Sequence, residues 1–171
     1  EIKDAVLERA GCVFLGDECA SAKIKAFLET TQNVIVLWGD MPLVKGETLK
    51  DAMKEHLDKS NDVTFLGSGI KSDDNNFDAY IIKAEKLMAL TDFFKDADDE
   101  LIKNITASDA KFSVYSVEAA DELIRVNDRV ELAAASKIMQ SRINTNLMLA
   151  GVTIIDPDNT FICNDAVIGI D

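Results

Sequence analysis

The stretch that decides the fold occupies residues 123–157 and has the sequence LIRVNDRVELAAASKIMQSRINTNLMLAGVTIIDP. It predicts one long helix from about residue 128 to residue 149, because apolar or small residues recur every three or four positions. This stripe consists of Leu132, Ser136, Met139, Ile143, Leu147 and Ala150. Asn127 stands where a helix N-cap belongs, and Gly151 stands where a helix ends. At about 1.5 Å per residue the helix would span roughly 33 Å, enough to reach between two parts of the molecule.

A different pattern follows the helix. Residues 152–155 form a short β-branched run, and residues 156–159 (DPDN) carry a turn signal. Ile162 and Ile168 then stand six positions apart. This spacing is found in β-helices, although one coil cannot bury its own apolar face and several must stack.

Three segments of this stretch closely resemble one enzyme family. They are residues 126–130 (VNDRV), 142–144 (RIN) and 147–157 (LMLAGVTIIDP). The family is that of the bifunctional bacterial N-acetylglucosamine-1-phosphate uridyltransferase/glucosamine-1-phosphate acetyltransferases. In these enzymes a Rossmann-like nucleotidyltransferase domain leads through a long helical arm into a left-handed β-helix. The resemblance implies a nucleotidyltransferase domain over residues 1–125, an arm over residues 126–151 and the start of a β-helix over residues 152–171, without the acetyltransferase half.

The composition is that of a globular domain with an acidic surface. The chain has 171 residues, of which 47% are hydrophobic, and a net charge of −13. Such a charge argues against nucleic acid or an anionic membrane as a partner, and a bound nucleotide would need a divalent metal and a local basic group to offset it. No apolar run approaches the ~18 residues of a membrane span, and no signal peptide is visible. Cys12, Cys19 and Cys163 lack metal-ligand spacing, which favours buried or free thiols in a reducing cytoplasm.

Helices and strands alternate ahead of the long helix. Helices are predicted over residues 1–10, 20–28, 48–57 and 83–90, and strands over residues 12–15, 33–38, 63–66, 79–82 and 112–117. Residues 33–38 (NVIVLW) form the strongest strand, a continuous apolar run typical of a strand covered on both faces. This alternation predicts an α/β domain with a mixed, mostly parallel sheet, and residues 112–117 are expected at its edge.

The strongest strand runs directly into Gly39 and Asp40. In open α/β sheets, ligands bind beyond the carboxyl ends of the strands. Gly39 would let a ligand approach the backbone closely, and Asp40 offers a hard oxygen of the kind that Mg²⁺ prefers. A role in a turn or as a helix cap would also explain an aspartate at this position.

The family resemblance implies roles for residues at this strand end. The family has a Gly-Asp-x-Pro-Leu motif preceded by an aromatic residue, as in residues 38–43 (WGDMPL). Its Asp and the Asn of its Val-Asn-Asp-Arg motif together bind the Mg²⁺ that bridges the substrate phosphates. These residues correspond to Asp40 and Asn127, although helix capping would also account for Asn127. Trp38 is expected to pack at the strand end and to line the pocket.

Two further matches to the family are weaker, because fewer residues of each motif are retained. The family's Leu-Gly-Thr-Gly-His-Ala loop, which contacts the uracil end of the nucleotide, corresponds to residues 15–20 (LGDECA). Gly16 is retained, whereas Asp17 and Glu18 replace the Thr and the second Gly and would repel a nucleotide. Asn76 resembles the sugar-contacting Asn of an Asn-x-Gly-x-Tyr motif, with a turn role as the alternative. The family's Gly-rich phosphate loop has no counterpart, which favours an incomplete chain over a degenerate domain.

His56, the only histidine, lies on the apolar side of the helix predicted over residues 48–57. It has no Cys, His or Ser partner in a catalytic spacing. We therefore expect a core or boundary residue and not a catalytic base.

The resemblance implies transfer of UMP from UTP to N-acetylglucosamine 1-phosphate, which yields pyrophosphate and UDP-N-acetylglucosamine, a cell-wall precursor. The sugar phosphate would attack the α-phosphorus in line, with Mg²⁺ as cofactor and no protein nucleophile. The alternatives are a pyrophosphorylase for another sugar or nucleotide, and a catalytically inactive assembly module. Because trimers in this family are held chiefly by the β-helix, we expect a homotrimer of the full-length protein and a monomer of this chain. Leu147 and Leu149 are expected to be packed.

Overall fold

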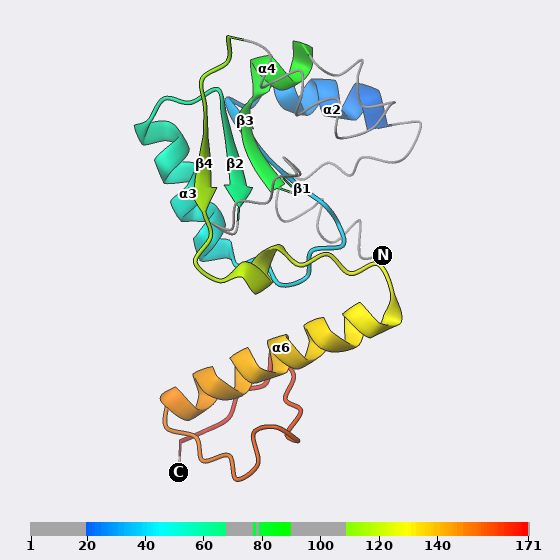
Figure 1. Ribbon diagram of the computed structural model, residues 1–171, viewed down its shortest axis with the longest axis vertical. Helices are drawn as coiled ribbons and strands as arrows, with labels where there is room; N and C mark the ends of the chain where they lie inside the picture. The colour runs from blue at the N-terminus through cyan, green and yellow to red at the C-terminus, as the bar shows by residue number, and fades with distance from the viewer. Residues whose placement is uncertain (1–19, 68–76, 78, 90–108, 171) are drawn as a thin grey trace. The chain divides into compact units, whose positions relative to one another are not determined.

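The computed structural model describes residues 20–67, 77, 79–89 and 109–170, with side chains from residue 25 onward. The chain forms two compact units (Figure 1). The first, the sheet unit, comprises Glu1–Leu37 and Gly46–Glu118, and the second, the helix unit, comprises Trp38–Lys45 and Ala119–Asp171. The segment after the strongest predicted strand thus groups with the C-terminal part of the chain, which the sequence did not indicate. The predicted elements at residues 1–10 and 12–15 lie outside the described residues.

The described elements of the sheet unit alternate as predicted. They are α2 (Ala20–Glu29), β1 (Asn33–Leu37), α3 (Gly46–Asp58), β2 (Val63–Gly67), β3 (Ala79–Lys83), α4 (Ala84–Ala89) and β4 (Phe112–Ser116). The strand order is β1-β3-β2-β4. β3 is antiparallel to both of its neighbours, whereas β2 and β4 are parallel. The sheet is therefore mixed, and β1, β2 and β4 share one direction, but antiparallel pairings outnumber parallel ones because β3 is inserted between β1 and β2.

Successive side chains of a strand point to opposite faces of a sheet. Helices pack on both faces of this sheet. On one face, Phe65 of β2 and Tyr80 of β3 join a core cluster with Leu28 of α2 and Leu87 of α4. On the other face, His56 of α3 is hydrogen-bonded to Thr64 of β2. The arrangement is a three-layer α/β/α unit (Figure 1).

Burial follows the strand order. The two central strands, β2 and β3, are buried at every position except the last. β4 alternates between exposed and half-buried positions at one end of the sheet, so its predicted edge position is confirmed. β1, predicted as a strand covered on both faces, is half-buried over its first four residues, and its last residue is exposed. The physical reason is its position at the opposite end of the described sheet, where one side has no neighbouring strand.

The long helix of the helix unit is α6, Arg129–Leu149. Its N-cap is Asp128, whose Oδ1 accepts hydrogen bonds of 2.8 Å from the backbone N–H groups of Val130 and Glu131. The predicted N-cap at Asn127 is thus one residue too early. Asn127 instead donates its backbone N–H to Glu131 Oε2 at 2.6 Å, which resembles the reciprocal half of a capping box. The predicted end of the helix is confirmed by Gly151, which has a φ of +100°.

The buried face of α6 differs from the predicted stripe. Met139, Ile143 and Leu147 are half-buried, and the two fully buried positions are Ala135 and Asn144. The exposed members of the stripe are Leu132, Ser136 and Ala150. Leu149 is 82% exposed, so its expected packing is wrong. The periodicity located the helix, but the polar Asn144, and not an additional apolar residue, marks the centre of the buried face.

The segment after α6 is held by the side chain of Asn144. Its Nδ2 donates to the carbonyl oxygens of Pro157 at 2.7 Å and Thr160 at 2.9 Å, and its Oδ1 accepts from Gln140 Nε2 at 3.0 Å. The predicted turn at residues 156–159 is present, because the backbone N–H of Asn159 donates to the Asp156 carbonyl. Residues 152–170 contain no strand, so the expected start of a β-helix is not confirmed. Within the described ranges, no helix has the length and apolar character needed to cross a membrane.

Candidate functional site

Asp40 follows β1, and the fold of the helix unit places it beside Arg125 and Val126. The Asp40 carbonyl oxygen accepts a hydrogen bond of 2.9 Å from the backbone N–H of Val126, the residue before Asn127. The fold thus brings the two predicted metal-binding segments together at the backbone level, although they lie far apart in the sequence. The Asn127 side chain is exposed, and its backbone N–H is used by Glu131.

Further contacts within the helix unit hold the segment Trp38–Lys45 in place. The Lys45 Nζ forms an ion pair of 2.9 Å with Oε1 of the buried Glu122, and the Lys45 backbone N–H donates to Oε2 at 3.3 Å. Arg142 of α6 donates to the Leu43 carbonyl oxygen at 2.7 Å and to Asp121 Oδ2 at 2.7 Å. These links fix the loop that carries Asp40 relative to the segment that carries Asn127.

The two carboxylate oxygens of Asp40 have different surroundings. Oδ2 accepts a hydrogen bond of 2.9 Å from Arg125 Nε and forms an ion pair with Arg125 Nη2 at 2.8 Å. Oδ1 is buried and has no hydrogen-bond partner among the described residues. A buried carboxylate oxygen without a partner is unfavourable by about 1–3 kcal/mol or more, which is a cost that a bound cation would remove.

Trp38 completes this group, which we call the Asp40 cluster: Trp38, Asp40 and Arg125. The Arg125 guanidinium carbon lies 4.7 Å from the centroid of the Trp38 ring, which is a cation–π distance. Gly39 has open space around it, since no atom would lie within 4 Å of an added Cβ. The predicted role of Gly39 in letting a ligand approach the backbone stays a prediction. Gly16 and Asn76, the other predicted substrate contacts, lie outside the described residues.

Arg125 was missed by the sequence analysis. The family motif begins at Val126, one residue later, and an ion pair across such a separation leaves no local pattern in the sequence. Across the part of the chain that the structure describes, no group of three or more His, Cys, Asp or Glu side chains is arranged to hold a metal. A Mg²⁺ ion at Asp40 would therefore need the Asn127 amide oxygen, water and substrate oxygens to complete its ligands.

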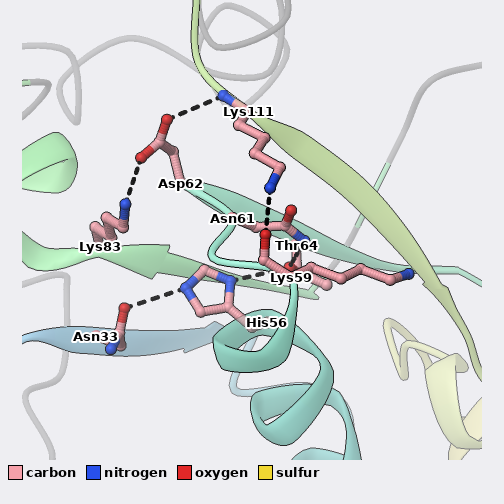
Figure 2. A network of polar contacts seen from close by, with 8 residues as sticks. All are labelled: Asn33, His56, Lys59, Asn61, Asp62, Thr64, Lys83 and Lys111. Carbon is pink, nitrogen blue, oxygen red and sulfur yellow. Dashed lines mark hydrogen bonds and ion pairs between the residues drawn. The ribbon is translucent and has the colours of Figure 1, made fainter.

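His56 occupies a buried network in the sheet unit and not a catalytic constellation (Figure 2). Its Nε2 lies 3.1 Å from Asn33 Oδ1, and its Nδ1 lies 2.9 Å from Thr64 Oγ1. Because the Asn33 oxygen can only accept, Nε2 carries the proton and the Thr64 hydroxyl donates to Nδ1. Asn61 Nδ2 then donates to Thr64 Oγ1 at 3.0 Å and to Ser113 Oγ at 2.7 Å. The expectation of a core histidine is confirmed.

Both ring nitrogens of a neutral His56 have hydrogen-bond partners in this network, and the charges around the ring also favour the neutral form. Burial lowers the pKa of His56, the charge of Lys83 lowers it further, and Asp62 partly offsets the shift. Nearby, the hydrogen bond of 2.7 Å from Lys83 Nζ lowers the pKa of Asp62, and the same contact raises the pKa of Lys83 (Figure 2). Protonated His56 would have to donate to Thr64, whose hydroxyl hydrogen would then lose its acceptor.

Acid should therefore weaken the sheet unit through His56. In the unfolded chain the imidazole of His56 binds a proton with a pKa near 6.5, and in the folded state the same group binds the proton less readily. The stability from neutral His56 is then complete above about pH 6.5 and is lost as pH falls from there toward the lower folded-state pKa, by up to about 1.4 kcal/mol per pH unit. Urea unfolding of the parent and of His56→Gln between about pH 7.5 and pH 5 measures this. Equal pH slopes for the two proteins would contradict the assignment.

A separate cleft of about 250 Å³ lies in the helix unit, lined by Lys45, Ser141, Arg142, Thr145 and Asn146. Its two basic residues are paired with Glu122 and Asp121, so their charges are already balanced. Asp40 does not line this cleft. The chemistry of the Asp40 cluster therefore makes it the better candidate site.

Comparison with known proteins supports the fold and the resemblance. The chain matches no family model. The structure resembles 4-diphosphocytidyl-2C-methyl-D-erythritol synthase from Anaerococcus prevotii, with a TM-score of 0.54 and 14% identity over 81% of this chain and 76% of that one. It also resembles molybdopterin-guanine dinucleotide biosynthesis protein A from Archaeoglobus fulgidus, with a TM-score of 0.55 and 20% identity over 81% and 75%. These two likenesses concern the fold alone, a mixed sheet with helices on both faces.

The sequence relatives are more specific. The chain is 31% identical to the bifunctional protein GlmU of Acetivibrio thermocellus, over 81% of this chain and 38% of the relative. It is 31% identical to GlmU of Caldanaerobacter subterraneus subsp. tengcongensis over 93% and 43%, and 29% identical to GlmU of Thermoanaerobacter pseudethanolicus over 100% and 46%. The chain is a homologue of part of the bifunctional GlmU proteins, which confirms the resemblance drawn from residues 126–157. It spans less than half the length of these relatives.

Proposed function

We propose that the protein takes part in the Mg²⁺-dependent transfer of UMP from UTP to N-acetylglucosamine 1-phosphate, which forms UDP-N-acetylglucosamine and pyrophosphate in the cytoplasm. The observation that carries this proposal is the unpaired, buried Oδ1 of Asp40, just beyond β1 and beside the segment that contains Asn127. The homology to GlmU proteins supports the reaction class. Other substrates in the same class remain the second candidate, because Asp17 and Glu18 replace the residues that contact uracil in the resembled family.

The residues of the Asp40 cluster fit a magnesium ion. Mg²⁺ in enzymes of this kind is bound through one or two carboxylates together with substrate phosphates. Asp40 offers one carboxylate oxygen that nothing else uses among the described residues, and Asn127 would add an exposed amide oxygen. When bound, the ion would neutralise charge on the phosphates and orient them for attack.

The protein's own residues would position the reactants. In-line phosphoryl or nucleotidyl transfer needs little covalent chemistry from the protein, so catalysis depends on orientation and charge. Gly39 leaves the approach to Asp40 open, and the Trp38 side chain is exposed beside it and can border a bound substrate. The links from Lys45 and Arg142 keep this loop at a fixed distance from Asn127.

Asn127→Ala tests the proposal without disturbing the helix. Because Asp128 is the N-cap and Asn127 contributes only its backbone N–H, we expect the free energy of unfolding to change by less than about 0.5 kcal/mol. The rate of uridyl transfer in the full-length protein should fall by at least about tenfold, since the amide oxygen would be lost as a ligand. Urea melts and pyrophosphate release measure the two quantities.

Asp128→Ala is the matched control for this experiment. It should cost about 1 kcal/mol of stability, as the loss of a helix cap does, while the folded protein keeps its turnover. Full turnover of Asn127→Ala would remove Asn127 from the proposed site.

A further inference from the structure

Arg125 is held on two sides by the Asp40 cluster. Its Nε donates a hydrogen bond of 2.9 Å to Asp40 Oδ2, and its Nη2 forms an ion pair of 2.8 Å with the same oxygen. The guanidinium also lies over the Trp38 ring, with its central carbon 4.7 Å from the ring centroid. A rigid, planar guanidinium that is stacked, hydrogen-bonded and ion-paired has a well-defined position.

This arrangement makes the two oxygens of Asp40 chemically unequal. Oδ2 is used by Arg125, whereas Oδ1 is buried and has no partner within the described ranges. A divalent cation that binds Asp40 would therefore find one oxygen without a hydrogen-bond partner, and the fixed positive charge of Arg125 would lie beside it. The positive charge of the guanidinium repels a metal ion that approaches the same carboxylate.

We propose that Arg125 is a positioning residue that restricts Asp40 to one-oxygen binding of a divalent cation and keeps that binding weak in the absence of substrate. The inference rests on the proposed function, because it assumes that the metal binds at Asp40. With the protein's own affinity held low, the cation reaches the site mainly together with the negatively charged phosphates of the nucleotide. Those phosphates offset the positive charge of Arg125.

A purely structural role would give a different result. If the ion pair only held residues 119–126 against the loop Trp38–Lys45, its removal would lower stability and leave metal affinity unchanged or weaker. The proposal predicts the opposite sign, namely tighter metal binding when the charge of Arg125 is removed. The two explanations are therefore separated by the direction of one measured change.

Trp38 supplies a local probe, because it is the only tryptophan in the chain and lies in the cluster itself. Mn²⁺ is a suitable metal, since it accepts the same oxygen ligands as Mg²⁺ and quenches nearby fluorescence through its unpaired electrons. The experiment titrates Mn²⁺ into the full-length protein without nucleotide and follows quenching of Trp38 fluorescence. Other carboxylates of this acidic chain bind Mn²⁺ too, but quenching at Trp38 reports mainly on the cluster.

Variants of Arg125 separate charge from hydrogen bonding. Arg125→Gln keeps an N–H donor for Asp40 but removes the charge, so the Mn²⁺ concentration at half-quenching should fall by at least about tenfold. Arg125→Lys keeps the charge and should stay near the parent value. Lys137→Ala removes the same charge from an exposed position on α6 and should leave the midpoint unchanged. Far-UV circular dichroism confirms that each variant is folded, and Arg125→Ala replaces Arg125→Gln if that variant does not fold.

The outcomes distinguish the two proposals. Asp40→Ala should abolish site-specific quenching. If Asp40→Ala is quenched like the parent, the metal does not bind at Asp40, and the proposed function fails together with this inference. If quenching is lost in Asp40→Ala but Arg125→Gln binds Mn²⁺ no more tightly than the parent, only the role of Arg125 is overturned.

Discussion

Replacing Asp40 by alanine should lower the rate of UMP transfer by at least about a hundredfold while the protein stays folded. A bound metal supplies several kcal/mol of charge stabilisation in the transition state, and each 1.36 kcal/mol is a factor of ten in rate. Stability should change by about 1 kcal/mol or less, because the Asp40–Arg125 pair is partly exposed and the hydrogen bond from Val126 uses the Asp40 backbone carbonyl. Initial rates of pyrophosphate release and urea melts of the full-length protein measure both effects.

Two variants sharpen this prediction. Asp40→Asn keeps an oxygen but loses the charge, so its metal binding should lie between those of the parent and Asp40→Ala. Glu55→Ala removes a carboxylate from a partly exposed ion pair of the sheet unit, that with Lys59, and should leave the rate within a few-fold of the parent. A rate near the parent value for Asp40→Ala would rule out the Asp40 cluster as the reaction site.

Replacing Phe65 by alanine should cost about 3–5 kcal/mol of folding free energy, the largest stability effect that we expect. Phe65 is 0% exposed and, among the described residues, is the largest fully buried side chain in the core of the sheet unit. Its ring stacks on Phe77 at a centroid distance of 4.6 Å and makes edge contacts with Tyr80 and Phe112 at 6.2 and 6.1 Å. Because domains are stable by only about 5–15 kcal/mol, this loss would leave the unit close to unfolding.

Phe161→Ala is the matched control for Phe65→Ala. Phe161 is 80% exposed, so the same chemical change should shift the free energy of unfolding by less than about 0.5 kcal/mol. Urea denaturation followed by far-UV circular dichroism compares the two variants. A loss below about 1 kcal/mol for Phe65→Ala would mean that the cluster around β2 and β3 is not the core that holds the unit together.

The sequence predicted the features that depend on local periodicity and local chemistry. The long helix was predicted within one residue at its start, because apolar spacing and end signals coincide there. β2 and β3 were predicted from short apolar runs, and both are buried central strands. The position of Asp40 after a strand followed from the adjoining sequence alone.

Features that depend on contacts across the chain could not be predicted. The place of β3 between β1 and β2 is set by long-range pairing, which leaves no mark in any one strand. Asn127 and Asp128 are both good capping residues, and only the backbone geometry makes Asp128 the cap. The ion pair between Asp40 and Arg125 required the fold of the helix unit. The buried Asn144 falls where a pattern-based analysis expects an apolar residue, so its role emerged only from its hydrogen bonds.

The hydrogen bonds of Asn144 also bear on where this chain could exchange parts with other proteins during evolution. The amide of a helix residue is satisfied by carbonyls at Pro157 and Thr160, beyond the end of that helix. A recombination point between residues 149 and 160 would separate donor from acceptors and leave a buried polar group unpaired, which selection would oppose. A recombination point after Thr160 would keep Asn144 and both of its carbonyl acceptors in the same segment. The segment that Asn144 holds therefore extends to Thr160, beyond Leu149, where the helix ends.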